Sequence, residues 1–418
     1  MLRGRALLTR LGGNLFDQGL AALSNVVLSV LVARSVDAEG FGSFSVAFLV
    51  YGIAYAAMRS VVGQPLQIKF SAAPPAELTR RTADALGTAL LLALPAALVC
   101  AVIGLLLQGT TGSALLMLAI WLPGLLVQDT CRMAFFARQR PWSAAVIDGV
   151  WAAVQFGLMA ALLMNGLGTL ELLMGAWGIG ALVAAVVGAG MLAVLPRLTA
   201  ARQWLREQGT LSRYLLAEYV LGLGTVQFGI LIVGVIATTE AVGSLRAAQV
   251  LLGPLGIVAT AMFQFTVPEV ARNLDMGAHK LQRLTWLVTG GLLAVHVVYV
   301  TALLWMPDQI GVQLFGDTWS GAAVVLLPMC LSACFSSMAN GPAGVLYGLG
   351  WARETFWINV IKCPMILVLL IGGTYLWGAL GSAWAFAAIE ALILPLWIVT
   401  VIRASHHPRA SQLTAAPA

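Results

Sequence analysis

The chain has 418 residues, of which 60% are hydrophobic and 10% charged, and its mean hydropathy is +0.92. A soluble protein carries about 25% charged residues, so this composition leaves no room for a sizeable soluble domain. The formal net charge of +6 comes from basic residues scattered through short connections. That distribution favours contact with anionic lipid headgroups and argues against nucleic-acid binding.

Charged and Gly/Pro-rich points divide the chain into apolar stretches long enough to cross a bilayer, which takes about 20 residues per helix. The first stretch continues to residue 33 without a small-residue cleavage site, so we interpret it as a retained span and not as a signal peptide. The predicted spans, in chain order, are 11–33, 41–62, 82–107, 113–136, 142–165, 171–195, 213–237, 241–267, 284–306, 318–340, 353–372 and 375–402. The predicted fold is an all-α polytopic membrane protein with about twelve transmembrane helices.

Lys and Arg concentrate in every second connection. One side of the predicted topology collects the basic N-terminus, the pair Arg80 and Arg81, and the stretch Arg197–Arg213, whereas Glu171 and Asp308 lie on the other side. By the positive-inside rule the basic side is cytoplasmic. Both termini are therefore predicted to be cytoplasmic, and an even number of spans agrees with this.

The stretch Arg197–Arg213 lies between six predicted spans and six more, which suggests an internal repeat. A shift of 201 positions aligns Asp17 with Glu218, Glu39 with Glu240, and Gly42-Ser43 with Gly243-Ser244. Both halves begin and end on the same side, so the repeat would be parallel. We predict an N-terminal six-helix lobe at 1–196, a cytoplasmic inter-lobe linker at 197–212, a C-terminal six-helix lobe at 213–403 and a disordered cytoplasmic tail at 404–418.

Ionisable residues inside a membrane are costly and normally face the bundle interior or a wet cavity. Arg59, Arg246 and Lys362 interrupt otherwise apolar spans, and Arg34 ends the first span on the outer side. Several cations facing one cavity would suit an anionic cargo such as a phosphate or pyrophosphate. In the alternative interpretation, Arg59 and Lys362 snorkel inward and Arg246 reaches the outer headgroups.

Acidic residues also fall within the spans, at Asp17, Asp148, Glu218 and Glu390. The first three also lie near enough to the inner surface to be hydrated there. Asp129 and Arg132 are spaced i, i+3 and are interpreted as a local pair. Amide side chains could line a cavity and bond sugar hydroxyls, or serve as contacts between helices; they are Gln18, Asn25, Gln64, Gln155, Gln227, Gln249 and Gln264.

Prolines such as Pro65 interrupt several spans and are interpreted as static kinks, which membrane helices tolerate. No cofactor, metal or disulfide is expected, because the five cysteines form no Cys-x-x-Cys pair and no Cys/His ligand set. The chain has no phosphate-binding Walker loop, so it does not hydrolyse ATP itself.

The opening of the chain resembles bacterial polysaccharide flippases, in which the first helix ends in Ala-Arg and an acidic-Gly-aromatic turn starts the second. The residues that carry this resemblance are Asn14–Gly19, Val32–Ser35 and Glu39–Phe44. Three further segments are similar to motifs of the same family, namely Leu314–Ala323, Arg140–Ser143 and Gly350–Arg353. The family is the O-antigen and exopolysaccharide branch of the multidrug/oligosaccharidyl-lipid/polysaccharide exporter superfamily.

This resemblance implies a V-shaped exporter whose two lobes rock around a central cavity and move a sugar chain on a polyprenyl (pyro)phosphate to the outer leaflet of the bacterial plasma membrane. It implies that Arg34, Arg59, Arg246 and Lys362 face the phosphate. A gradient of H⁺ or Na⁺ would supply the energy, with Asp17, Glu218, Asp148 and Glu390 as candidate coupling residues. Other polysaccharide-assembly proteins and membrane lipids would be the partners.

Other interpretations remain. A fourteen-span lipid-precursor flippase is close, but only twelve spans are predicted here, and a non-transporting structural membrane protein is a further alternative, although buried charges are a wasteful way to build one. A multidrug or toxin cation antiporter of the same superfamily would prefer acidic and aromatic residues in its cavity, whereas the deeper cations of this chain favour an anion. A membrane glycosyltransferase or polymerase acting on the same lipid-linked sugars generally needs a substantial outer loop. No predicted outer connection is long enough for one, so we expect a transporter and not an enzyme.

Overall fold

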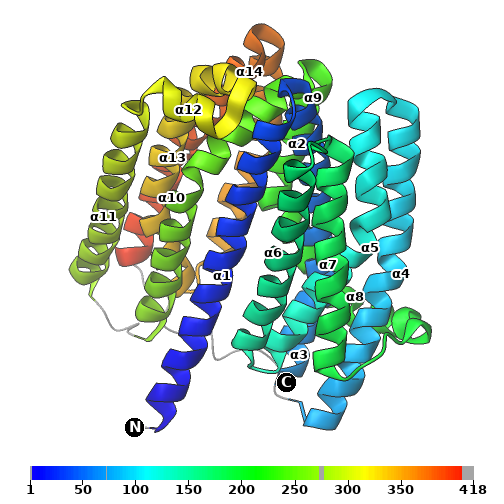
Figure 1. Ribbon diagram of the computed structural model, residues 1–418. Coiled ribbons are helices and arrows are strands. Elements are labelled where there is room, and N and C mark those ends of the chain that lie inside the picture. Colours follow the sequence, from blue (N-terminus) through cyan, green and yellow to red (C-terminus); the bar gives the residue numbers. More distant parts are fainter. Residues whose placement is uncertain (1, 72, 273–276, 407–418) are drawn as a thin grey trace. The chain divides into compact units, whose positions relative to one another are not determined.

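The computed structural model describes the backbone of residues 2–71, 73–272 and 277–406 (Figure 1). It describes their side chains as well, except those of residues 2–18, 218, 222, 223, 264, 268, 271, 272 and 352. These described residues fold into helices and contain no strand. Contacts divide the chain into two compact units, Met1–Gln227 and Phe228–Ala418.

The first unit contains eight α-helices, a π-helical turn η1 and a short 3₁₀ turn η2, before the chain passes through η3 into α9. Their bounds are α1 Leu2–Ser35, α2 Ala38–Met58, η1 Arg59–Gly63, α3 Gln64–Phe70, α4 Pro75–Leu107, α5 Gly109–Ala137, α6 Pro141–Met164, α7 Leu170–Leu192, η2 Leu198–Ala200, α8 Ala201–Tyr219 and η3 Val220–Gly224. Helix α5 lies at the centre of this unit, because it packs against α2, α4, α6 and α7.

The second unit consists of long helices packed around α13, which contacts α10, α11 and α14. The bounds are α9 Thr225–Ile236, α10 Thr239–Arg272, α11 Ala278–Leu304, α12 Asp308–Phe315, η4 Gly316–Thr318, α13 Trp319–Gly348 and α14 Ala352–His406. Buried apolar side chains of α10, α11, α13 and α14 form its core, among them Val270, Leu281, Val345 and Ile393.

Nine of the described helices are long and apolar enough to cross a bilayer, and Gly19–Ser35 and Thr225–Ile236 are shorter apolar helices. One of the nine, Arg353–His406, is divided by non-helical backbone at Trp377 and Gly378. The described chain thus carries the twelve apolar helical segments that the sequence predicts. It is an all-α, multi-pass membrane protein.

The structure corrects the predicted break between the last two spans, which moves from residues 373–374 to Trp377 and Gly378. Gly378 has φ +58°, a left-handed conformation that glycine adopts without steric cost. The two halves of α14 then approach so closely that a Cβ on Gly381 would collide with the carbonyl of Gly373. Here two glycines permit a tight helical hairpin.

The segment predicted as a linker, 197–212, is helical, since η2 and α8 cover most of it. The backbone of Arg197 packs against α4, where its N–H donates to the carbonyl of Ala83 at 2.9 Å. The predicted tail at 404–418 also begins within a helix, because α14 extends to His406. Residues 407–418 lie outside the described residues.

Candidate functional site

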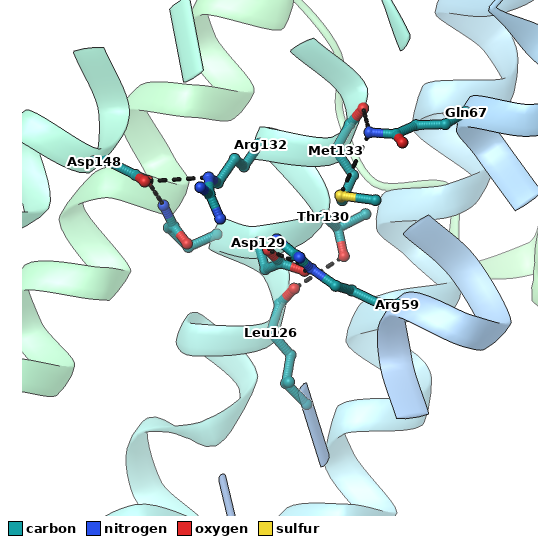
Figure 2. A network of polar contacts seen from close by, with 9 residues as sticks. Arg59, Gln67, Leu126, Asp129, Thr130, Arg132, Met133 and Asp148 are labelled. Atoms are coloured by element: carbon teal, nitrogen blue, oxygen red, sulfur yellow. Dashed lines mark hydrogen bonds and ion pairs between the residues drawn. The ribbon is translucent and has the colours of Figure 1, made fainter. Parts of the chain in front are cut away.

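A buried ion pair joins η1, the turn that follows α2, to α5 in the first unit (Figure 2). The Arg59 guanidinium donates from Nε to both carboxylate oxygens of Asp129, at 3.2 and 2.9 Å, and from Nη2 to Oδ1 at 2.7 Å. The Asp129 side chain is 4% exposed, whereas that of Arg59 is 24% exposed. This is the planar two-pronged geometry in which Arg–carboxylate pairs are strongest.

Arg59 is the first residue of the π-helical turn η1, in which the N–H of Gln64 bonds to the carbonyl of Arg59. π-Turns within α-helices recur at functional sites. Tyr55 lies one turn earlier, and the Arg59 guanidinium stacks over its ring at 4.4 Å. The aromatic ring and the carboxylate of Asp129 therefore hold the guanidinium from two sides.

A second ion pair lies one turn further along α5 and joins it to α6. Arg132 Nε contacts Asp148 Oδ2 at 3.1 Å, and the side-chain amide of Gln128 donates to Asp148 Oδ1 at 2.8 Å. Both charged side chains are buried, with 7% and 8% of their surface exposed. Asp129 and Arg132, which the sequence suggested as a local pair, each also bridge to a neighbouring helix. The α5 segment from Gln128 to Arg132 thus forms the centre of a polar network spanning α2, α5 and α6.

Aromatic rings line the α2 side of this network. Tyr51 packs edge-on against Trp177 of α7 at 5.1 Å, and Tyr51 and Tyr55 lie 5.6 Å apart. Trp177 also stacks with Trp151 of α6 at 6.4 Å. These rings form a continuous aromatic cluster from α2 to α6 and α7.

In the second unit, Lys362 and Glu390 face each other across the hairpin of α14. Lys362 Nζ donates to Glu390 Oε1 at 2.6 Å, and the two side chains are 23% and 16% exposed. The sequence singled out both residues, with a cargo role for one and a coupling role for the other. They form one ion pair.

The structure also describes the side chains of two further predicted cations, Arg34 and Arg246. Arg34 is exposed in the last turn of α1, where it lines an open depression of about 680 Å³ together with Asp37 and Glu171. Arg246 is half-buried on α10. The side chains of the predicted coupling residues Asp17 and Glu218 lie outside the described residues.

The described side chains contain no group of three His, Cys, Asp or Glu residues placed to hold a metal ion. The partnership of Asp129 with Arg59 does not follow from the sequence, although Asp129 is the lone carboxylate of α5 and Arg59 is the lone arginine of residues 38–70. The principle that every buried charge needs a partner predicts that Asp129 has a cationic partner. It does not identify which of the available cations that partner is.

No protein-family model and no curated protein sequence matches the chain. Several solved structures resemble it over nearly its full length, and three of them illustrate the similarity. An inward-facing multidrug resistance MATE family transporter of the MOP superfamily has a TM-score of 0.68 at 13% identity, covering 93% of this chain and 96% of that one. The lipid II flippase MurJ in an inward closed conformation has a TM-score of 0.71 at 11% identity, with coverages of 92% and 86%.

The third is a MOP superfamily transporter from Pyrococcus furiosus, with a TM-score of 0.50, 12% identity and 96% of each chain covered. It is described as having a binding pocket of reverse polarity that suggests a different function. At these identities the similarity establishes the fold. The chain shares its helical architecture with the MATE family transporter of the MOP superfamily and with the lipid II flippase.

Proposed function

We propose that this protein is a flippase of the bacterial plasma membrane that moves a polyprenyl-(pyro)phosphate-linked oligosaccharide to the outer leaflet for surface polysaccharide assembly. Two lobes, 1–196 and 213–403, would alternate the exposure of a central cavity, with both termini in the cytoplasm. The resemblance of short sequence motifs to polysaccharide flippases supports the substrate class, and the MOP transporter architecture supports the transport mechanism.

The observation that carries the proposal is the state of the Arg59 guanidinium. Asp129 engages its Nε and Nη2, while Nη1 forms no hydrogen bond with any described residue. A guanidinium that a carboxylate holds by Nε and Nη2, on a side chain that stays 24% exposed, can bind a phosphate oxygen at Nη1 without first having to be ordered, which lowers the entropic cost of binding. Arg59 is therefore the residue that we assign to the phosphate of the cargo.

Lys362 can contribute to the same recognition only by exchanging Glu390 for a phosphate oxygen. Such an exchange would leave the carboxylate without its cation, and a carboxylate without its cation takes up a proton or a sodium ion more readily. Cargo binding and ion binding would then be linked at this pair. This makes Lys362–Glu390 the described pair best suited to ion coupling by H⁺ or Na⁺, and Asp17, Asp148 and Glu218 are further candidates.

The alternative function is a multidrug or cation antiporter, as in the MATE transporters with the same fold. A lipophilic cation would need a carboxylate that is free to receive it. Asp129, Asp148 and Glu390 each already contact a basic side chain in this structure. Drug binding at any of them would require a cation of the protein to be displaced, which favours the anionic cargo.

The two functions can be separated with purified protein in lipid vesicles that contain a short-chain polyprenyl pyrophosphate disaccharide in the inner leaflet. A membrane-impermeant oxidant of vicinal diols would report how much of this lipid reaches the outer leaflet. We expect translocation that requires an imposed H⁺ or Na⁺ gradient and is lost in Arg59→Met. Gradient-driven efflux of ethidium from the same vesicles, without movement of the lipid, would establish the antiporter instead.

A further inference from the structure

The π-helical turn that carries Arg59 contains a carbonyl group that its own helix cannot satisfy in the α-helical register. Pro65 follows four residues after Val61. In an α-helix the N–H of the residue at position 65 would donate to the carbonyl of Val61, but proline has no N–H and its ring pushes that carbonyl away. In this structure residues 59–63 form the π-helical turn η1, and side-chain donors from another helix can bond the Val61 carbonyl in place of the N–H that proline lacks.

Helix α8 supplies that donor twice. The indole Nε1 of Trp204 donates to the carbonyl oxygen of Val61 at 3.1 Å, and the hydroxyl of Ser212 donates to the same oxygen at 3.2 Å. Trp204 is 1% exposed and Ser212 is 6% exposed, so water does not compete for either bond. Because the two donors lie eight positions apart on α8, both belong to one face of that helix.

Other contacts hold α8 in place beside this carbonyl. The ring of Trp204 lies 6.0 Å from that of Phe70, at the end of α3. Glu207 accepts a hydrogen bond from Arg81 of α4 at 2.7 Å. The position of α8 relative to η1 is therefore fixed by contacts that are independent of the bonds to Val61.

We propose that Trp204 and Ser212 are positioning residues for Arg59. By donating to Val61 they replace the bond that Pro65 removes and keep the turn in its π-helical register, which aims the Arg59 guanidinium at Asp129. Helix α8 leads through η3 into α9 and the second unit. A displacement of α8 that breaks the two bonds would therefore release the turn and change the presentation of Arg59. The positioning role stands on the structure alone, and its consequence for cargo rests on the proposed function.

Amide hydrogen exchange at residues 59–66, measured in lipid nanodiscs, tests the positioning role without any substrate. Trp204→Phe combined with Ser212→Ala removes both donors and keeps most of the packing. We expect exchange in this segment to be faster by about 10-fold or more, the effect of losing a buried hydrogen bond. Unchanged exchange would overturn the proposal.

A matched control exists in the second unit. Trp319 donates from Nε1 to Asp308 Oδ1 at 3.1 Å, and Ser337 donates to the carbonyl of Cys334 at 2.7 Å. Trp319→Phe with Ser337→Ala therefore removes the same two kinds of side-chain donor away from η1, and it should leave exchange at residues 59–66 unchanged. Ser212→Thr, which keeps a hydroxyl, should preserve more of the protection than Ser212→Ala. Equal acceleration by the control pair would show a general loosening and would contradict a specific role for α8.

The sharpest test is Pro65→Ala, which restores a backbone N–H that can donate to Val61. In this background the loss of Trp204 and Ser212 should accelerate exchange far less than it does in the native chain. Acceleration of the same size in both backgrounds would show that the two residues do not stand in for the donor that proline lacks.

Binding of a polyprenyl pyrophosphate without sugar extends the test to function. Arg59→Lys and the variant lacking both α8 donors should each lower the affinity for this lipid. The variant that combines all three changes should bind as well as the weaker-binding of the two, because both sets of changes act through the same guanidinium. If Arg59→Lys binds the lipid normally, the cargo role of Arg59 is wrong, and exchange alone then decides the positioning role. Additive losses would mean that α8 acts on binding by a route other than Arg59, which would overturn the inference for cargo.

Discussion

Replacing Arg59 by Met should separate the structural from the functional role of the Arg59–Asp129 pair. Met retains much of the length of the side chain but leaves the Asp129 carboxylate, which is 4% exposed, without its cation. Removing one partner of a buried ion pair typically costs about 3–5 kcal/mol. Because Arg59 is itself 24% exposed, water can compensate in part, and we expect a loss near the lower end, about 3 kcal/mol. The free energy of unfolding in mixed micelles would measure this loss.

The double variant Arg59→Met with Asp129→Leu removes both charges and fills the space with apolar groups. Such replacements of buried pairs are often neutral, so stability should return to within about 1 kcal/mol of the native protein. Transport should not return, because the guanidinium that we assign to the phosphate is absent. Recovered stability without recovered transport is therefore the expected signature.

A matched control uses Arg81 and Glu207, whose Nη1–Oε2 distance of 2.7 Å equals the shortest distance in the Arg59 pair. Glu207 is 34% exposed, and exposed pairs contribute about 0.2–1 kcal/mol. Glu207→Gln, which removes the exposed charge of this pair, should thus cost much less than Arg59→Met. The reasoning is refuted if the two losses are equal, and the cargo role of Arg59 is refuted if the double variant transports lipid-linked oligosaccharide at the native rate.

Three further outcomes are expected. Lys362→Met should destabilise the second unit by about 2–4 kcal/mol. Adding Glu390→Gln to this variant should recover most of the lost stability, and transport measured in vesicles should no longer depend on the ion gradient. Gly381→Ala should lower the thermal unfolding temperature because its Cβ meets the backbone of the other half of α14, whereas Gly372→Ala, which has open space around it, should leave the temperature unchanged. The pKa of the Glu207 carboxyl is lowered by a hydrogen bond from the Gln one turn earlier and by the neighbouring Arg side chains. The contribution of the Glu207 carboxylate to stability is therefore present above the ordinary pKa of Glu and is lost as the pH falls through the lowered value. The difference in free energy of unfolding between the native protein and Glu207→Gln should shrink over that acidic range.

The membrane-spanning architecture could be predicted because it depends on length and hydrophobicity, which the sequence displays directly. Local geometry could not be predicted as well. The break in the last helix was placed at residues 373–374, where two adjacent glycines and a threonine interrupt the apolar run. It occurs at Gly378, whose left-handed backbone allows the chain to reverse. Several glycines lie close together in this stretch, and the sequence does not indicate at which of them the helix breaks.

Candidate site residues could be recognised one at a time but could not be paired. Lys362 and Glu390 are 28 positions apart, and their meeting depends on where the hairpin between them turns. An error of two residues in that turn rotates a helical side chain by about 200° and would move one partner to the opposite face. The same dependence on register concealed the contact between Arg59 and Asp129.

The ion pairs also change the role that can be inferred for the intramembrane cations. A cavity lined by unpaired arginines and lysines would repel protons and sodium ions and would be costly to build within a bilayer. Arg59, Arg132 and Lys362 instead each contact a carboxylate, so these parts of the spans are nearly neutral before cargo arrives. An anionic cargo then gains affinity either from unused edges of a guanidinium, as at Arg59, or by displacing a carboxylate, as at Lys362. Only the second route sets a carboxylate free, so ion coupling should depend on Glu390 more strongly than on Asp129, and transport by Asp129→Asn should keep its gradient dependence while that by Glu390→Gln loses it.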